Sequence, residues 1–290
     1  MAAVMVLGAT GQLGADVVDA FGSARSEVIG LGHREVDVTD FASVSAVVGA
    51  ARPALVVNTT AFHNLELCEE DQTSAFAVNA IGARNVAMAA HATGAALIHI
   101  STDYVFDGLK QSPYDEGDLP GPLNVYGASK LAGEQLVRAA CPRSFVVRTS
   151  GLYGPRPCRA KGGLNFPLLM LKLAREKGEL TVVTDEVVCP TYTPDLARQL
   201  VALSNTEAYG TVHATGVGEV SWHGFATEIL RLSGLTNVPV HEATSATMVR
   251  KVKRPSYSIL AHRRLQQLDI VAMRPWEEAL TDYVRLLGQL

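Results

Sequence analysis

The first half of the chain alternates short apolar runs with helix-length segments, and this alternation limits the possible folds more than any other feature. The apolar runs have the length of strands and read VMVLG, EVIGLG, ALVVNTT, ALIHIS and FVVRTS. Amphipathic segments separate them, among them a long predicted helix that begins at Ser74 and ends at Gly94. Apolar strands that alternate with helices are typical of a parallel sheet covered on both faces. We therefore predict an α/β fold, a Rossmann-like doubly wound parallel sheet with a smaller mixed α/β lobe.

The composition of the chain changes after Ser150. The segment GLYGPRPCRAKGG is rich in glycine, proline and basic residues, which is typical of a long loop. We predict a dinucleotide-binding domain over residues 1–150 and a mainly substrate-binding lobe over residues 151–290. Segments near 180–186 and 211–215 are expected to return to the first domain. Helices are predicted after this loop at 165–177, 194–203, 222–233 and 276–287. In the first half, Asp40 and Asn124 are predicted helix caps.

Bulk properties exclude several classes of protein. The formal net charge of −4 argues against a nucleic-acid or anionic-membrane partner. No apolar stretch of about 18 residues occurs, so no membrane span is expected. The N-terminus lacks the pattern of a signal peptide, and the cysteines lack CxxC spacing. We therefore expect a cytoplasmic protein with reduced thiols and no metal. The basic run Arg250–Pro255 is either a solvated loop or a grip on a substrate diphosphate.

A glycine-rich turn follows the first predicted strand. Gly8, Gly11 and Gly14 form GxxGxxG, one residue different from the GxGxxG fingerprint of dinucleotide-binding proteins. Glycine permits positive φ and lets a pyrophosphate approach the backbone, where the N-terminus of the next helix supplies N–H donors. The position of the triplet, in the first turn of a βαβ series, favours a dinucleotide site.

The residues beyond this turn favour NADPH over NADH. About 20 positions on, an acidic residue would hold a ribose hydroxyl, but this chain has His33 and Arg34 there. An arginine suits a 2′-phosphate, although Arg34 pointing to solvent or stacking on the adenine is the alternative. Asp37 is a candidate polar contact near the adenine.

A candidate catalytic trio lies further along. Tyr126 and Lys130 in YGASK are neighbours on one helical face, with Tyr126 in the first turn after Asn124. The helix dipole and the nearby ammonium are expected to favour the phenolate, since a free tyrosine has a pKa of about 10. Thr102 ends a buried strand, at the edge where open parallel sheets bind ligands. Together with NTTA after the third strand, this trio resembles an extended short-chain dehydrogenase/reductase.

A closer resemblance covers nearly the whole chain. GATGQLG, DVTD, STDYVFDG, PLNVYGASKLAGE, VRTSGLYG and CPTYTPDLA, in this order, resemble the dTDP-4-dehydrorhamnose reductase family. The resemblance implies reduction of the C4 carbonyl of a dTDP-linked 4-keto-6-deoxy sugar with NADPH or NADH, to give dTDP-L-rhamnose. It implies that Tyr126 donates the proton, that Lys130 is its partner, and that Thr102 and Asp103 meet the sugar.

The cofactor contacts that these patterns and the resemblance imply are Gly8, Thr10, Gly11, Gln12, Leu13, Gly14, Arg34, Asp37, Val38, Thr59, Thr60, Ala61, Phe62 and Lys130. One departure concerns the sugar. Gly151 stands where enteric enzymes carry a tryptophan that packs on the sugar, so the pocket there is either wider or filled by another group. The loop residues Arg156, Arg159 and Lys161 either clamp a diphosphate or form a lid.

Two other functions agree with the same motifs. One is a nucleotide-sugar epimerase or dehydratase of the same superfamily, although the usual Asp-Glu pair of a dehydratase is not evident beside Thr102. The other is a non-catalytic NADP-binding subunit, like the regulatory β subunit of methionine adenosyltransferase. Homodimers are common in this superfamily, so a homodimer is possible.

Overall fold

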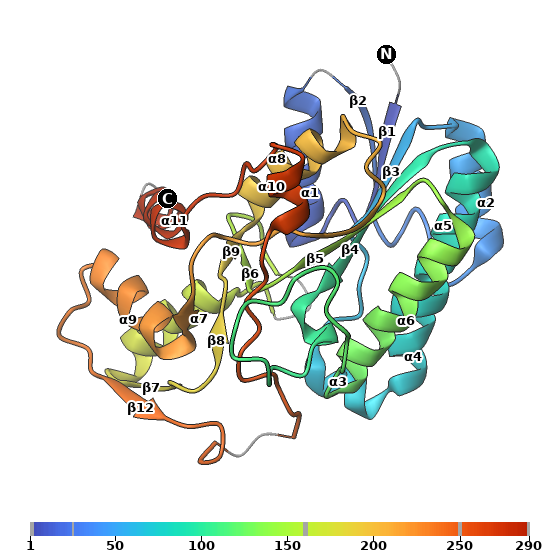
Figure 1. Cartoon of the computed structure of the whole chain (residues 1–290). Helices are drawn as coiled ribbons and strands as arrows, with labels where there is room; N and C mark the ends of the chain where they lie inside the picture. Colours follow the sequence, from blue (N-terminus) through green and yellow to red (C-terminus); the bar gives the residue numbers. More distant parts are fainter. Residues whose placement is uncertain (1–2, 25, 159–161, 249–250, 289–290) are drawn as a thin grey trace.

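The computed structural model describes residues 3–24, 26–158, 162–248 and 251–288, and its centre is a six-stranded parallel sheet (Figure 1). The strand order is β10-β5-β4-β3-β1-β2. The strands are β1 (Ala3–Leu7), β2 (Glu27–Leu31), β3 (Leu55–Asn58), β4 (Ala96–Thr102), β5 (Ser144–Thr149) and β10 (Gly210–His213). The order reverses between β1 and β3, which is where an open α/β sheet binds its ligand.

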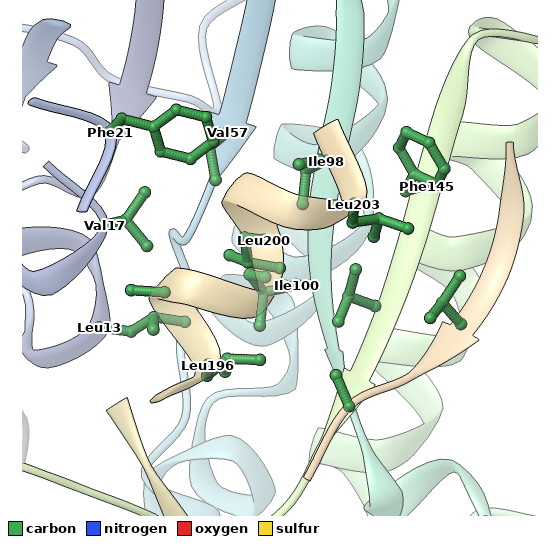
Figure 2. Packing of buried hydrophobic residues seen from close by; sticks show 14 of the residues in the cluster. Leu13, Val17, Phe21, Val57, Ile98, Ile100, Phe145, Leu196, Leu200 and Leu203 are labelled. Atoms are coloured by element: carbon green, nitrogen blue, oxygen red, sulfur yellow. The ribbon is translucent and has the colours of Figure 1, made fainter. Parts of the chain in front are cut away.

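Helices cover both faces of this sheet, as the doubly wound prediction requires. One face packs on α1 (Gln12–Ser23) and α8 (Thr193–Ser204). Leucines of these helices meet Val57, Ile98 and Phe145 of the strands (Figure 2). The opposite face packs on α2 (Phe41–Ala51), α5 (Ala83–Thr93) and α6 (Val125–Ala140). The predicted α/β class is confirmed.

Local capping follows the sequence closely. The Asp40 carboxylate accepts the Ala42 N–H at 2.9 Å, and the Asn124 side chain accepts the Gly127 N–H at 2.8 Å. Gly94 ends α5 with a φ of +76°. All three predicted helix ends are confirmed.

The long helix predicted from Ser74 is interrupted. It is divided into α4 (Gln72–Phe76), a π-helical turn (Ala77–Gly82) and α5. The Asn79 side chain in this turn accepts the Phe62 N–H and donates to the Phe62 carbonyl, both at 2.8 Å. Gly133 of α6 packs on the same turn, where a Cβ would lie 2.1 Å from the Asn79 carbonyl oxygen. The wider turn therefore places Asn79 between the loop after β3 and helix α6.

The second half returns to the main sheet only in part. The segment expected near 211–215 does so, since β10 pairs with β5. The segment expected near 180–186 does not: β7 (Leu180–Val183) pairs with β12 (Val240–Ala243) in a separate two-stranded sheet. β7 buries three of its four residues and packs on helices of the second lobe, and so short an apolar run does not show which sheet it joins.

An aromatic cluster holds the later elements together. Tyr153, Phe225, Trp276 and Tyr283 are buried in it with side chains of α7 (Phe166–Lys177), α9 (Trp222–Leu232) and α11 (Trp276–Gly288). The remaining elements are α3 (Leu65–Glu70), the 3₁₀ turn η2 (Asp103–Val105), α10 (Arg263–Gln267), β6 (Leu152–Tyr153), β8 (Val187–Val188), β9 (Thr191–Tyr192) and β11 (Val220–Ser221).

Candidate active site

The glycine turn packs too tightly for larger residues at two of its three positions. Gly8 has a φ of +82°, and a Cβ on it would lie 2.6 Å from Thr59 Oγ1. A Cβ on Gly14 would lie 2.1 Å from the Gly8 carbonyl oxygen, so glycine lets α1 begin directly against the turn. Gly11 is the N-cap of α1 and places no side chain over the first N–H groups. The free N-terminus of α1 therefore faces outward over the turn.

The donors at this turn fit an anionic diphosphate. No acidic side chain lies in the first turn of α1. Gln12 Nε2 is buried and has no hydrogen-bond partner among the described residues, and a phosphate oxygen would satisfy it. Leu13 is buried in the core, so only its backbone is available to a ligand, whereas Thr10 is exposed.

The turn after β2 carries the residues predicted to meet the adenosine. Arg34 is exposed, and among the described residues it has no ion pair. Asp37 accepts hydrogen bonds from the Thr39 hydroxyl at 2.8 Å and the Thr39 N–H at 2.9 Å, which lower its pKa. Val38 is buried, and its carbonyl accepts a hydrogen bond from the Asn85 side chain at 3.0 Å. Asp37 thus orders the turn, and its carboxylate is exposed on it.

The loop after β3 runs alongside the glycine turn and is held rigidly. Thr59 Oγ1 donates to the Leu7 carbonyl at 2.8 Å, and Thr60 Oγ1 donates to Asn58 Oδ1 at 2.7 Å. Ala61 and Phe62 are half-buried, and Asn79 holds the backbone of Phe62 as described above. The predicted residues 59–62 and the glycine turn therefore lie together at the carboxyl end of the sheet.

Thr102 and Tyr126 meet through their hydroxyl groups. Thr102 ends β4, and its Oγ1 donates to Asp103 Oδ1 at 3.0 Å. The Tyr126 hydroxyl is hydrogen-bonded to the Thr102 side chain. Gly127 allows the approach, since a Cβ there would lie 2.1 Å from the Tyr104 carbonyl oxygen.

The pKa of Tyr126 shifts in the direction opposite to the one expected from the sequence. Burial raises the pKa of Tyr126, the hydrogen bond with Thr102 lowers it, and the charge of Asp103 raises it further. The helix dipole and Lys130 do not overcome the loss of water around the phenol. Tyr126 is therefore protonated at neutral pH, as a proton donor must be.

Lys130 lies one turn further along α6 and is 1 % exposed. Its Nζ donates to the Ile100 carbonyl at 2.6 Å and lies 3.4 Å from His99 Nε2. Burial lowers the pKa of Lys130 to about 8, against the opposing charge of Glu134. Glu134 itself is bound by Arg148 of β5 through two hydrogen bonds, of 2.9 and 2.7 Å.

The side chain of Asp103 is buried in the protein. Besides Thr102, its carboxylate accepts hydrogen bonds from the hydroxyls of Ser150, at 2.9 Å, and Ser258. Burial raises the pKa of Asp103, and these hydrogen bonds partly offset the shift. The residue is 3 % exposed, so its geometry suits orientation of Thr102. Sequence reasoning missed Ser258, and it missed Ser150 although this residue lies within the quoted motif VRTSGLYG.

Gly151 has no space for a larger side chain. Its φ is +55°, and a Cβ would lie 3.1 to 3.3 Å from Val188, Cys189 and Pro190. The segment from β8 to β9 therefore fills the side of Gly151 toward which a side chain would point.

The basic residues proposed as diphosphate grips are mostly paired with acids. Arg156 donates a hydrogen bond to the Asp19 carboxylate of α1 at 2.6 Å, so this carboxylate already occupies its guanidinium. Lys251 pairs with Glu70 at 3.3 Å, and Arg254 pairs with Glu66 at 3.5 Å. Lys253 is exposed, with no ion pair among the described residues, and Arg159, Lys161 and Arg250 lie outside the described residues.

Comparison with known proteins identifies the family. The model of the RmlD substrate binding domain matches residues 1–288. A dTDP-4-dehydrorhamnose reductase of Streptomyces griseus is 38% identical over 96% of this chain and 91% of its own length. The chain belongs to the dTDP-4-dehydrorhamnose reductase family. The spore coat polysaccharide biosynthesis protein SpsK of Bacillus subtilis (strain 168) is 40% identical over 98% of both chains.

A solved structure of a family member agrees closely with the fold. The dTDP-4-dehydrorhamnose reductase of Bacillus anthracis str. Ames, solved in complex with NADP, has a TM-score of 0.92 and 36% identity. The match covers 97% of this chain and 98% of that one. Within the described residues, no helix is both long and apolar enough to cross a membrane. All four cysteines are buried, and none forms a disulfide with another described residue.

Proposed function

We propose that this protein reduces the C4 carbonyl of a dTDP-linked 4-keto-6-deoxy sugar with NADPH, with dTDP-4-dehydrorhamnose as the leading substrate. The observation that carries the proposal is the contact between the Tyr126 and Thr102 hydroxyls at the carboxyl end of β4, next to the glycine turn. Membership of the family supports the same chemistry.

The chain's own residues account for the acid side of the reaction. Tyr126 is protonated and donates its proton to the carbonyl oxygen as negative charge develops there. Thr102 would bind that oxygen by rotating its hydroxyl proton toward it from Asp103, which accepts this proton in the structure. To Lys130, one turn from Tyr126 on α6, we assign the return of a proton to the tyrosine.

The proposed cofactor site consists of the glycine turn, residues 59–62 and the turn after β2. When bound, NADPH supplies the hydride. Gln12 and the N-terminus of α1 would hold the diphosphate, Asp37 and Val38 would border the adenine, and Lys130 would reach the nicotinamide ribose. The unpaired Arg34 guanidinium would bind a 2′-phosphate, which supports NADPH over NADH.

The sugar site is proposed between the edge of the main sheet and the later elements. Thr102, Asp103 and Gly151 border this region. The division into residues 1–150 and 151–290, and a homodimer, remain predictions; multi-angle light scattering of the purified protein tests the dimer.

The test is a screen of dTDP-, UDP-, GDP- and CDP-linked 4-keto-6-deoxy sugars with NADPH and with NADH. We expect oxidation of NADPH with the dTDP-linked sugar and loss of at least about 100-fold in rate for Tyr126→Phe. Full activity of Tyr126→Phe would refute the mechanism. Sugar conversion without net consumption of NADPH would instead identify an epimerase.

A further inference from the structure

A chain of buried polar side chains leads from the loop after β3 to Lys130. Asn58 of β3 and His99 of β4 are register partners in the sheet, and both are 1 % exposed. Asn58 Nδ2 lies 3.3 Å from His99 Nδ1, and His99 Nε2 lies 3.4 Å from Lys130 Nζ. Because all three side chains are buried, the direction of each hydrogen bond has consequences for the charge of Lys130.

The orientation of the Asn58 amide follows from Thr60. Asn58 Oδ1 accepts the Thr60 backbone N–H at 3.1 Å and the Thr60 hydroxyl at 2.7 Å. A backbone N–H only donates, so the atom that faces it must be the amide oxygen. The NH₂ group of Asn58 therefore faces His99.

This orientation determines the tautomer of His99. An amide NH₂ only donates, so His99 Nδ1 must accept and carry no proton. Burial lowers the pKa of His99 well below its ordinary value, which keeps the ring neutral. The one ring proton is then on Nε2, and it points toward Lys130.

An N–H that faces Lys130 discriminates between the two charge states of the lysine. A neutral amine has a lone pair that accepts this hydrogen bond, whereas an ammonium has only donors and is repelled. The Ile100 carbonyl accepts from either form. We propose that His99 is a positioning residue whose Nε2–H, oriented by Asn58, favours the neutral amine of Lys130 and so prepares it to exchange protons near neutral pH.

The other charged or titratable groups near this site leave that role to His99. From α6 itself, Glu134 favours the ammonium, but Arg148 of β5 and Ser101 of β4 occupy its carboxylate. The charges of Asp103 of η2 and Cys68 of α3 act on the phenol of Tyr126.

The inference rests on the proposed function only for the role of Lys130 beside Tyr126, and its test does not require turnover. The measurement is the ¹³Cε chemical shift of labelled lysines against pH, with Lys130 assigned through Lys130→Arg. In the parent protein we expect Lys130 to titrate near pH 8, below the surface lysines. His99→Phe and Asn58→Ala are expected to raise this midpoint by about one pH unit, the equivalent of one neutral hydrogen bond.

Asn85→Ala is the matched control, since Asn85 is a buried asparagine that bonds the Val38 and Thr39 carbonyls, away from Lys130. It should leave the Lys130 midpoint unchanged. An unchanged midpoint in both test variants would overturn the proposal. If neither variant folds, the ¹⁵N shifts of His99 in the parent protein decide: a ring protonated on Nε2 supports the proposal, and one protonated on Nδ1 refutes it. Reductase activity with an unshifted Lys130 would refute this inference alone.

Discussion

Gly127 offers a direct test of how helix α6 places the catalytic tyrosine. It lies in the first turn of α6, next to Tyr126, and packs on the Tyr104 backbone. In Gly127→Ala the new Cβ would start 2.1 Å from the Tyr104 carbonyl oxygen, whereas carbon–oxygen contacts are normally about 3.3 Å or longer. The first turn must therefore retreat by about 1 Å and carry Tyr126 away from Thr102.

The expected loss is large for the rate and small for stability. A misplacement of about 1 Å costs on the order of 100-fold in rate, so kcat for NADPH oxidation with the dTDP-linked 4-keto sugar should fall by about that factor. Overpacking costs about 1–3 kcal/mol, of which the better helix propensity of alanine offsets about 1 kcal/mol. Urea unfolding measures the stability, and steady-state kinetics measure the rate.

Gly49→Ala is the matched control. Gly49 lies inside α2, and a Cβ there would meet nothing within 4 Å. This variant should gain up to about 1 kcal/mol and keep its kcat. If Gly127→Ala kept kcat within twofold of the parent, the argument from close packing would be wrong.

Three further predictions concern the cofactor, the core and acid stability. Arg34→Ala should raise KM for NADPH at least about tenfold and leave KM for NADH nearly unchanged, measured by steady-state kinetics. Glu134→Gln should cost about 3 kcal/mol in urea unfolding, because it leaves the Arg148 guanidinium buried without its partner. Burial lowers the pKa of His213 to about 3 and of His262 to about 4. As pH falls below about 6.5, these histidines become protonated in the unfolded chain while they stay neutral in the folded chain. The folded state therefore loses stability, by about 2 kcal/mol per histidine at pH 5. Calorimetry should therefore show a lower Tm at pH 5 than at pH 7, and an equal or higher Tm would contradict this.

Periodicity and capping predicted most of the sheet and its helices. Strands buried on both faces appear in the sequence as continuous apolar runs. The helix ends at Asp40, Gly94 and Asn124 carry capping residues. The pairing of β7 with β12 was not predictable in this way, since a short apolar run does not specify the strand with which it pairs. Pattern also indicated that Thr102 and Tyr126 would come together. The raised pKa of Tyr126 was not accessible, because it depends on how completely later segments exclude water.

The carboxylate of Asp103 is held by hydroxyls that lie far apart along the chain, at positions 102, 150 and 258. During synthesis the cofactor turn, β4 and α6 are all made well before Ser258 leaves the ribosome. A shortened chain that keeps the main strands but stops before residue 258 would leave one oxygen contact of Asp103 unmade. Completion of this hydrogen-bond set thus links orientation of the catalytic threonine to the arrival of Ser258, near the end of the 290-residue polypeptide.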